Sequence, residues 1–145
     1  MSFSPSKIVV PIDFSGESPH AIQTAIGITD DASKLHLVHV LLPLDTVSPG
    51  VLLGDVSDES RREVVTEKLN QLAAEHGASG AAISVQLGTP GLQIADYAKE
   101  QAADLIVIPS HGYHGVKRMF LGSVAERVIR HAECSVLVLR RSDAD

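Results

Sequence analysis

The chain has 145 residues, of which only one is cysteine, none is tryptophan and 3% are aromatic. A single cysteine, Cys134, excludes an internal disulfide framework and a zinc site built from cysteines. So few aromatic rings offer no platform on which nucleic-acid bases could stack. The 18 acidic residues outnumber the 12 basic ones and give a net charge of −6, whereas a general nucleic-acid binder carries a basic face. We therefore expect no nucleic-acid partner.

Long apolar runs are also absent. No segment reaches the length of a membrane span, and residues 1–6 lack the apolar core of a signal peptide, so we expect a cytoplasmic protein. The hydrophobic share of 44% and the charged share of 21% suit one domain with a sizeable core. We expect this single domain to span residues 1–145, with its core in 7–139.

Apolar runs of strand length alternate with helical patterns along the chain. The expected strands are 7–13, 35–42, 82–87, 104–109 and 135–139. Helices are expected after Ser18-Pro19, over 58–76, after Thr89-Pro90 and from Ser123. This alternation predicts a parallel sheet with helices on both faces, and the residues alone allow either strand order 2-1-3-4-5 or 3-2-1-4-5.

Three local signals predict helix ends. Ser18 is expected to cap the first helix, with Pro19 in the first helical position. Ser123 is expected to cap the last helix, and Glu126 three residues later has the spacing of a capping box. Gly77 is expected to end the second helix in a left-handed conformation.

The strongest candidate for a binding site follows the fourth strand. Pro109-Ser110-His111-Gly112 is separated by nine residues from Gly122-Ser123. Glycines in such a loop allow close approaches that a side chain would block. Backbone amides and the helix N-terminus at Ser123 then form a concave site for an anion. A phosphate-bearing ligand is therefore the first hypothesis.

Topology points to the same place, since ligands of open α/β sheets bind beyond the carboxyl ends of the strands where the strand order reverses. In the order 3-2-1-4-5 this point lies between the strand that ends at Asp13 and the strand that ends at Pro109. Asp13 equally suits an ordinary turn through residues 14–16. The alternative of a receiver domain is rejected, because its third strand would end on an aspartate and here it ends at Gln86-Leu87-Gly88.

Several other residues between positions 111 and 134 are also candidates for function. His111 and His114 have a spacing open to a metal, but exposed loop histidines are the favoured interpretation, and Mg²⁺ arriving with phosphates is preferred to a protein cage. Lys117 or Arg118 could lie near phosphate charge. Arg130 is expected on a solvated helix face, and Cys134 is expected to be buried and inert.

These motifs together resemble the universal stress protein family from Lys7 to Leu139. Nucleotide-binding members of that family carry Gly-x-x-Gly, nine residues, and then Gly-Ser or Gly-Thr, a spacing that 109–112 and Gly122-Ser123 match. Further matches are the segments 10–13, 88–90, 104–107 and 131–139. One departure is Pro109 in place of the first glycine. Proline lacks an N–H and fixes φ near −65°, so binding weakens if that amide donated or its φ was positive, and we expect binding to survive.

The expected fold is a three-layer αβα sandwich with a five-stranded parallel sheet in the order 3-2-1-4-5, Rossmann-like and of the adenine nucleotide alpha hydrolase-like kind. The resemblance implies ATP, with Mg²⁺ as a possible companion. Three or four amide–phosphate bonds at roughly 1.5–3 kcal/mol each, less ordering costs, suggest an affinity in the micromolar range. The residues implied for adenine, then ribose, then phosphates are Pro11, Ile12, Asp13 and the main chain of Val40, then Ile108 and Pro109, then Gly112, Gly122, Ser123 and Val124.

The expected function is an ATP-binding regulatory or stress-response role. The sequence shows no general base set beside a nucleophile and no Gly-x-x-x-x-Gly-Lys-Ser/Thr loop, which speaks against efficient catalysis. Two alternatives stay open: a slow ATPase or nucleotide transferase of the same fold, and a stress protein that binds no nucleotide and acts through partner contacts. A homodimer is expected through the apolar edge strand Cys134–Leu139, as the resemblance also implies.

Overall fold

A computed structural model describes residues 3–43, 57–110 and 121–140 of the chain. Its elements are β1 (Ile8–Pro11), α1 (Ser18–Thr29), η1 (Ala32–Lys34), β2 (Leu35–Leu41), α3 (Asp58–Glu75), β3 (Ala82–Leu87), α4 (Pro90–Glu100), β4 (Leu105–Pro109), α5 (Ser123–His131) and β5 (Ser135–Leu139). The candidate residue Gly112 and the neighbouring His111, His114, Lys117 and Arg118 lie outside the described residues.

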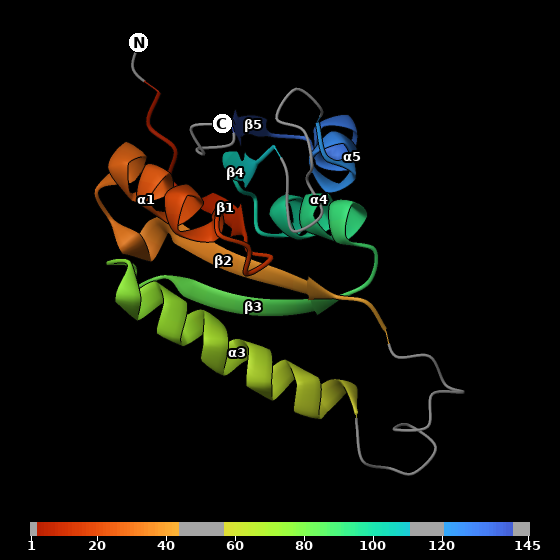
Figure 1. The fold of residues 1–145 in the computed structure, drawn as a ribbon. Coiled ribbons are helices and arrows are strands. Elements are labelled where there is room, and N and C mark those ends of the chain that lie inside the picture. The colour runs from red at the N-terminus through yellow and green to blue at the C-terminus, as the bar shows by residue number, and fades with distance from the viewer. Residues whose placement is uncertain (1–2, 44–56, 111–120, 141–145) are drawn as a thin grey trace.

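The five strands form one parallel sheet in the order β3-β2-β1-β4-β5 (Figure 1). The expected order 3-2-1-4-5 is therefore confirmed, and the alternative 2-1-3-4-5 is wrong. The reversal of strand order falls between β1 and β4, because β1 leads to β2 on one side and β4 lies on its other side. None of the helices in the described part of the chain is long and apolar enough to cross a membrane.

Helices cover both faces of the sheet (Figure 1), and on each face an apolar layer packs between the helices and the strands. On one face, Ile22 of α1 and Leu69 of α3 pack with alternate residues of β1 and β2. On the other face, Ile94 of α4 and Val128 of α5 pack against Ile106 of β4 and its neighbours. β1 is buried along its whole length, as expected for a central parallel strand with a continuous apolar sequence.

Of the three predicted helix ends, the one at Gly77 is confirmed and the caps at Ser18 and Ser123 are wrong. Gly77 has φ of +76°, and the Ala78 amide donates to the Ala73 carbonyl at 2.8 Å, as a left-handed helix end requires. Ser18 does not cap α1, since the N-cap is Glu17 and Ser18 is already the first helical residue. The side chain of Ser18 is buried and lies 3.4 Å from Asp13 Oδ1, so packing against the preceding turn moved the helix start by one residue.

Asp104 fastens the chain before β1 to the start of β4. Its Oδ2 accepts hydrogen bonds from the amide and the hydroxyl of Ser6 and from the Lys7 amide, while the Asp104 amide donates to the Lys7 carbonyl at 3.0 Å. These bonds, with the Ser6 hydroxyl first, hold the pKa of Asp104 below its usual range. The carboxylate thus helps to fix the register of two neighbouring strands.

We expect Asp104→Asn to lower the free energy of unfolding at neutral pH by about 1 kcal/mol or less, because the lost bonds are screened by solvent. A carboxyl group whose pKa is depressed in the folded state stabilises the fold above its unfolded pKa and loses that effect as pH falls through its folded pKa. The difference between parent and variant should therefore be smaller in acid than at neutral pH. Urea unfolding at pH 7 and at pH 3 measures it, and an equal difference at both values contradicts this account.

Candidate functional site

The ladder between β1 and β4 stops early, at the point where the strand order reverses. Its register covers only Ile8 with Leu105 and Val9 with Ile106, whereas β4 stays paired with β5 as far as Pro109. The Ile12 amide faces β2, since it donates to the Val38 carbonyl at 2.8 Å. Backbone groups alternate in direction along a strand, so the nitrogen of Pro11 faces β4.

Pro109 stands in the matching place on the other strand. The Ser110 amide donates to the Leu139 carbonyl of β5 at 2.8 Å, so the nitrogen of the preceding residue, Pro109, faces β1. Neither proline has an N–H, and the two rungs that would continue the β1–β4 ladder cannot form. The β1–β4 ladder is therefore interrupted at the carboxyl ends of these strands, and we call this unpaired stretch the β1–β4 gap.

The turn after β1 forms one side of the β1–β4 gap. Asp13 Oδ1 accepts a hydrogen bond from the Ser15 amide at 2.9 Å, which is the local turn that aspartate commonly closes. Phe14 takes a φ of +63°, which is uncommon for a residue with a side chain. Asp13 thus has the turn role that the sequence left open as an alternative, and its contact with a ligand stays a prediction.

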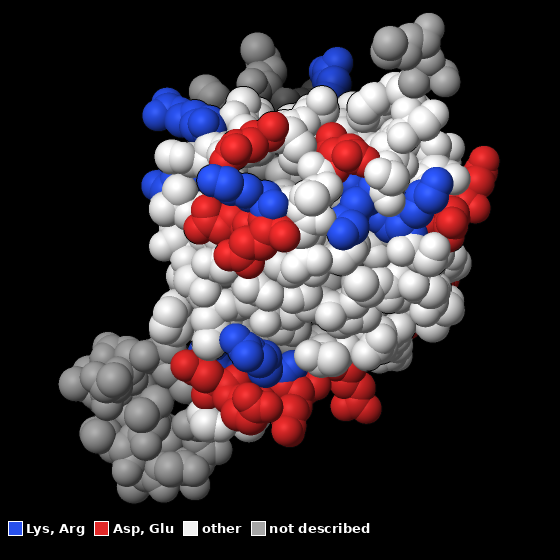
Figure 2. All heavy atoms as spheres, turned by 180° about the vertical axis from the view of Figure 1, so that it is seen from behind, with Lys and Arg blue, Asp and Glu red and all other residues white. Residues whose placement is uncertain are grey.

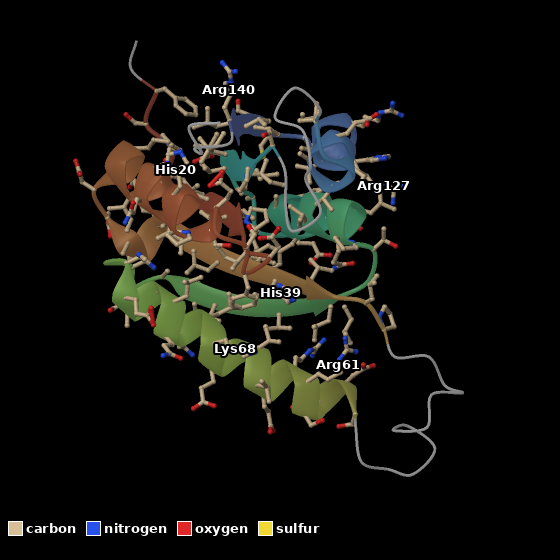
Figure 3. The ribbon with its side chains drawn as sticks, in the orientation of Figure 1. His20, His39, Arg61, Lys68, Arg127 and Arg140 are labelled. Carbon is tan, nitrogen blue, oxygen red and sulfur yellow. The ribbon has the colours of Figure 1, made fainter. Side chains whose placement is uncertain are left out.

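Strand β2 contributes a histidine that the sequence reasoning missed. His39 Nδ1 lies 2.6 Å from the Ile12 carbonyl oxygen, and its ring centroid is 5.0 Å from that of Phe14. Figure 3 shows His39 between β2 and the turn that follows β1. The sequence offered one signal: His39 is the polar member of an alternating series whose other members, Leu35, Leu37 and Leu41, face the core.

The start of α5 lies on the opposite side of the gap. The Gly122 amide donates to the Ser110 carbonyl at 2.6 Å, so the two ends of segment 111–120 are held together. Gly122 is the N-cap of α5, and among the described residues no side chain caps this end. Helix geometry leaves the first amides of α5 without an acceptor inside the helix, and these amides belong to Ser123, Val124 and Ala125.

The capping box predicted at Ser123 is therefore wrong. Ser123 is the first helical residue rather than the cap, and Glu126 pairs instead with Arg130 one turn later, with 2.7 Å between oxygen and nitrogen. Gly122 has the extended backbone conformation of an N-cap residue, with φ of −68° and ψ of 156°. The side chain of Ser123 is left exposed, beside the first amides of α5.

The described candidates fall into two groups at the carboxyl edge of the sheet. Pro11, Ile12 and Asp13 lie beside Val40 across the β1–β2 pair, and Ile108 and Pro109 end the neighbouring strand, from which Ser110 connects to Gly122. Ile12 and Ile108 are buried. The structure thus brings these residues to one edge, and their contact with a ligand stays a prediction.

Other predicted features have mixed outcomes. Within the described ranges, no group of three or more His, Cys, Asp or Glu side chains could hold a metal ion. Cys134 was expected to be buried, but it is only partly buried, since it directly precedes the edge strand β5. Burial still raises the pKa of its thiol, so the reactive thiolate is disfavoured. On the face in Figure 2, acidic and basic side chains are interspersed.

Comparison with known proteins gives a consistent result. The model of the universal stress protein family matches residues 5–140. A universal stress protein of Methanocaldococcus jannaschii is 34% identical, with 93% of this chain and 82% of the relative aligned. The structure of the universal stress protein UspA from Lactobacillus plantarum has a TM-score of 0.72 and 26% identity, covering 96% of this chain and all of that one. A universal stress protein from Archaeoglobus fulgidus, solved in complex with dAMP, has a TM-score of 0.61 and 25% identity, with 97% and 100% coverage. The chain belongs to the universal stress protein family.

Proposed function

We propose that this protein binds ATP at the β1–β4 gap and acts as a nucleotide-dependent regulator in the stress response. The observation that carries this proposal is the gap itself, opened by Pro11 and Pro109 where the strand order reverses and flanked by the uncapped start of α5. The structural relative from Archaeoglobus fulgidus, which binds dAMP, supports an adenine nucleotide as the ligand class.

The proposed phosphate site is the first turn of α5. Three amides without an intrahelical acceptor, those of Ser123, Val124 and Ala125, carry the positive end of the helix dipole and favour a negative group. Each bond from an amide to a phosphate oxygen contributes about 1.5–3 kcal/mol, which after ordering costs gives an affinity near the micromolar range. Gly112 is proposed to add to this site, and Mg²⁺ would enter with the phosphates.

The proposed adenine site lies on the other side of the gap, at Pro11, Ile12, Asp13 and the main chain of Val40. Val40 follows Val38 by two residues, so its backbone N–H and C=O also face β1. The last registered pair of β1 and β2 is Pro11 with Val38, so Val40 lies beyond the end of this ladder. Ile108 and Pro109 are proposed to contact the ribose, between the adenine site and the phosphate site.

A regulatory role is favoured over turnover by the bonding of the two titratable side chains that the structure describes at the gap. Asp13 is bonded within its turn and His39 is bonded to the Ile12 carbonyl. Both side chains therefore serve the shape of the site. Steady-state measurement of ATP hydrolysis separates this role from the alternative of a slow ATPase.

The proposal is tested first by mass spectrometry of small molecules released when the purified protein is denatured, and then by calorimetric titration with ATP and AMP. We expect an adenine nucleotide in the released fraction and a dissociation constant on the order of micromolar. A protein that is folded, carries no nucleotide and binds neither ATP nor AMP would contradict the proposal and favour a role through partner contacts alone.

Pro109→Gly tests the departure from the family motif. The amide gained at position 109 would face the Pro11 carbonyl across the gap, and this carbonyl competes with the ligand for it. As a donor to the ligand the amide should tighten ATP binding by no more than about 1.5–3 kcal/mol. The free energy of unfolding should fall by about 0.4–1 kcal/mol, because glycine gives the unfolded chain more freedom. Calorimetry and thermal unfolding measure the two effects, and unchanged affinity with lower stability would show that this amide is not a ligand donor.

We also propose a homodimer formed through β5. The Leu139 carbonyl faces β4, since it accepts from Ser110, so the backbone groups of Val136 and Val138 point to the open edge of the sheet. Leu137 is 38% exposed on this apolar strand. Such an edge invites pairing with another strand, and pairing with its own copy across a two-fold axis leaves no free edge there.

A further inference from the structure

The bond from His39 to the Ile12 carbonyl stands where the β1–β2 ladder would otherwise gain one more rung. In a parallel ladder, the Ile12 amide donates to Val38 and the Ile12 carbonyl accepts from the Val40 amide. The first of these bonds is formed at 2.8 Å, whereas the described residues show no matching bond from Val40. The ring of His39 meets the Ile12 carbonyl instead, with Nδ1 at 2.6 Å.

We propose that His39 is a positioning residue for the nucleotide: it ends the β1–β2 ladder at the Ile12 carbonyl and thereby keeps the Val40 amide available to the ligand. This inference rests on the proposed nucleotide site. It adds that one donor of that site, the Val40 amide, makes no ladder bond when the ligand is absent. The Val40 N–H and C=O form an adjacent donor and acceptor that point to one side of the strand. The amino-pyrimidine edge of adenine offers an acceptor and a donor next to each other, which this pair complements.

Histidine suits this role because its Nδ1 atom lies within hydrogen-bond distance of the Ile12 carbonyl oxygen. A carbonyl oxygen only accepts, so Nδ1 must carry the proton. Both the Nδ1–H neutral tautomer and the doubly protonated ring supply that proton, and the bond therefore persists in either charge state. The side chain comes from β2 itself, and a ring nitrogen next to Cγ reaches the neighbouring strand without crossing the site.

The contact with Phe14 holds this arrangement in place. The two rings have centroids 5.0 Å apart and are inclined by 49°, a geometry within the usual range of ring contacts. Phe14 reaches His39 from a backbone with φ of +63°, which persists only where the surroundings stabilise it. His39 thus fixes both the Ile12 carbonyl and the turn that carries Asp13.

The test compares His39→Leu with His39→Asn. Leucine has no donor, so the Ile12 carbonyl is free to accept from Val40 and the ladder gains a rung. Asparagine carries Nδ2 at the same branch as Nδ1 of histidine and restores the donor. His36→Leu is the matched control, because His36 lies on the same strand but faces the other layer, where its Nδ1 is 2.8 Å from the Tyr97 hydroxyl.

Two readouts are taken on each protein: hydrogen exchange of the Val40 amide by NMR without ligand, and the affinity for AMP by calorimetry. We expect the Val40 amide to exchange rapidly in the parent protein and to become protected in His39→Leu. We expect His39→Leu to weaken AMP binding about tenfold, the effect of about one hydrogen bond. His39→Asn should stay within about threefold of the parent, and His36→Leu should lower stability without changing either readout.

The outcomes separate the inference from the proposed function. If the parent protein binds no AMP, the proposed function fails and the ligand role of His39 fails with it. If the parent binds AMP but His39→Leu binds equally well, only the inference is overturned. A Val40 amide that is already protected in the free parent protein also overturns it.

Discussion

Gly122→Val is expected to remove most of the ATP affinity while the protein stays folded. Gly122 has φ of −68° and ψ of 156°, an extended conformation that valine adopts readily, so the backbone does not require glycine there. A branched side chain at this position would stand over the first amides of α5 and block the phosphates. The loss of one amide–phosphate bond is about 1.5–3 kcal/mol, or roughly 10- to 150-fold in dissociation constant by calorimetry.

Gly27→Ala supplies the matched control for this experiment. Gly27 lies within α1, and a Cβ added there meets no atom within 4 Å. The change should leave ATP binding unaltered and raise the free energy of unfolding by about 0.5–1 kcal/mol, the usual gain from glycine to alanine in a helix. Unaltered ATP affinity in Gly122→Val would place the phosphates elsewhere.

Val138→Pro is expected to convert the proposed dimer to a monomer. The Val138 amide faces the open edge of β5, so proline there deletes a donor of the pairing between copies and leaves the β4–β5 bonds in place. Val136→Pro should act in the same way for the same reason. Light scattering at tens of micromolar measures the molecular mass, and circular dichroism verifies that the variants are folded.

Leu137→Pro is the contrasting control, because the Leu137 amide faces β4 within the sheet. It should lower stability severely rather than change the oligomeric state alone, since the lost bond lies inside the fold. A parent protein that is monomeric at these concentrations contradicts the dimer. A dimer that persists in both Val136→Pro and Val138→Pro would place the interface on another surface.

The order of the elements could be predicted from the sequence because each strand is a short apolar run bounded by turn residues. Such runs as 105–108 are buried on both faces, and their alternation with helices leaves few topologies. The strand order needed more than the pattern, since both orders bury the same runs. The family resemblance favoured the order that the structure shows.

The details of the site were harder to predict. Helix starts at Ser18 and Ser123 each differ by one residue from the predicted cap, because a tertiary contact in one case and the conformation of Gly122 in the other replaced the side-chain cap. The sequence showed Pro109 as a departure from a motif but not that Pro11 faces it across the gap. That pairing depends on backbone directions in neighbouring strands, and the role of His39 depends on them too.

The most direct test of the account is an NMR titration of the isotope-labelled protein with ATP, followed through its backbone amides. We expect shifts concentrated at residues 12–14, 38–41, 108–110 and 122–125, which surround the β1–β4 gap, with saturation in the micromolar range. Amides on the outer face of α3, such as those of Glu63 and Glu67, should not shift. Shifts centred on α3, or no saturable shifts at millimolar ATP, would contradict the central claim that this gap is a nucleotide site.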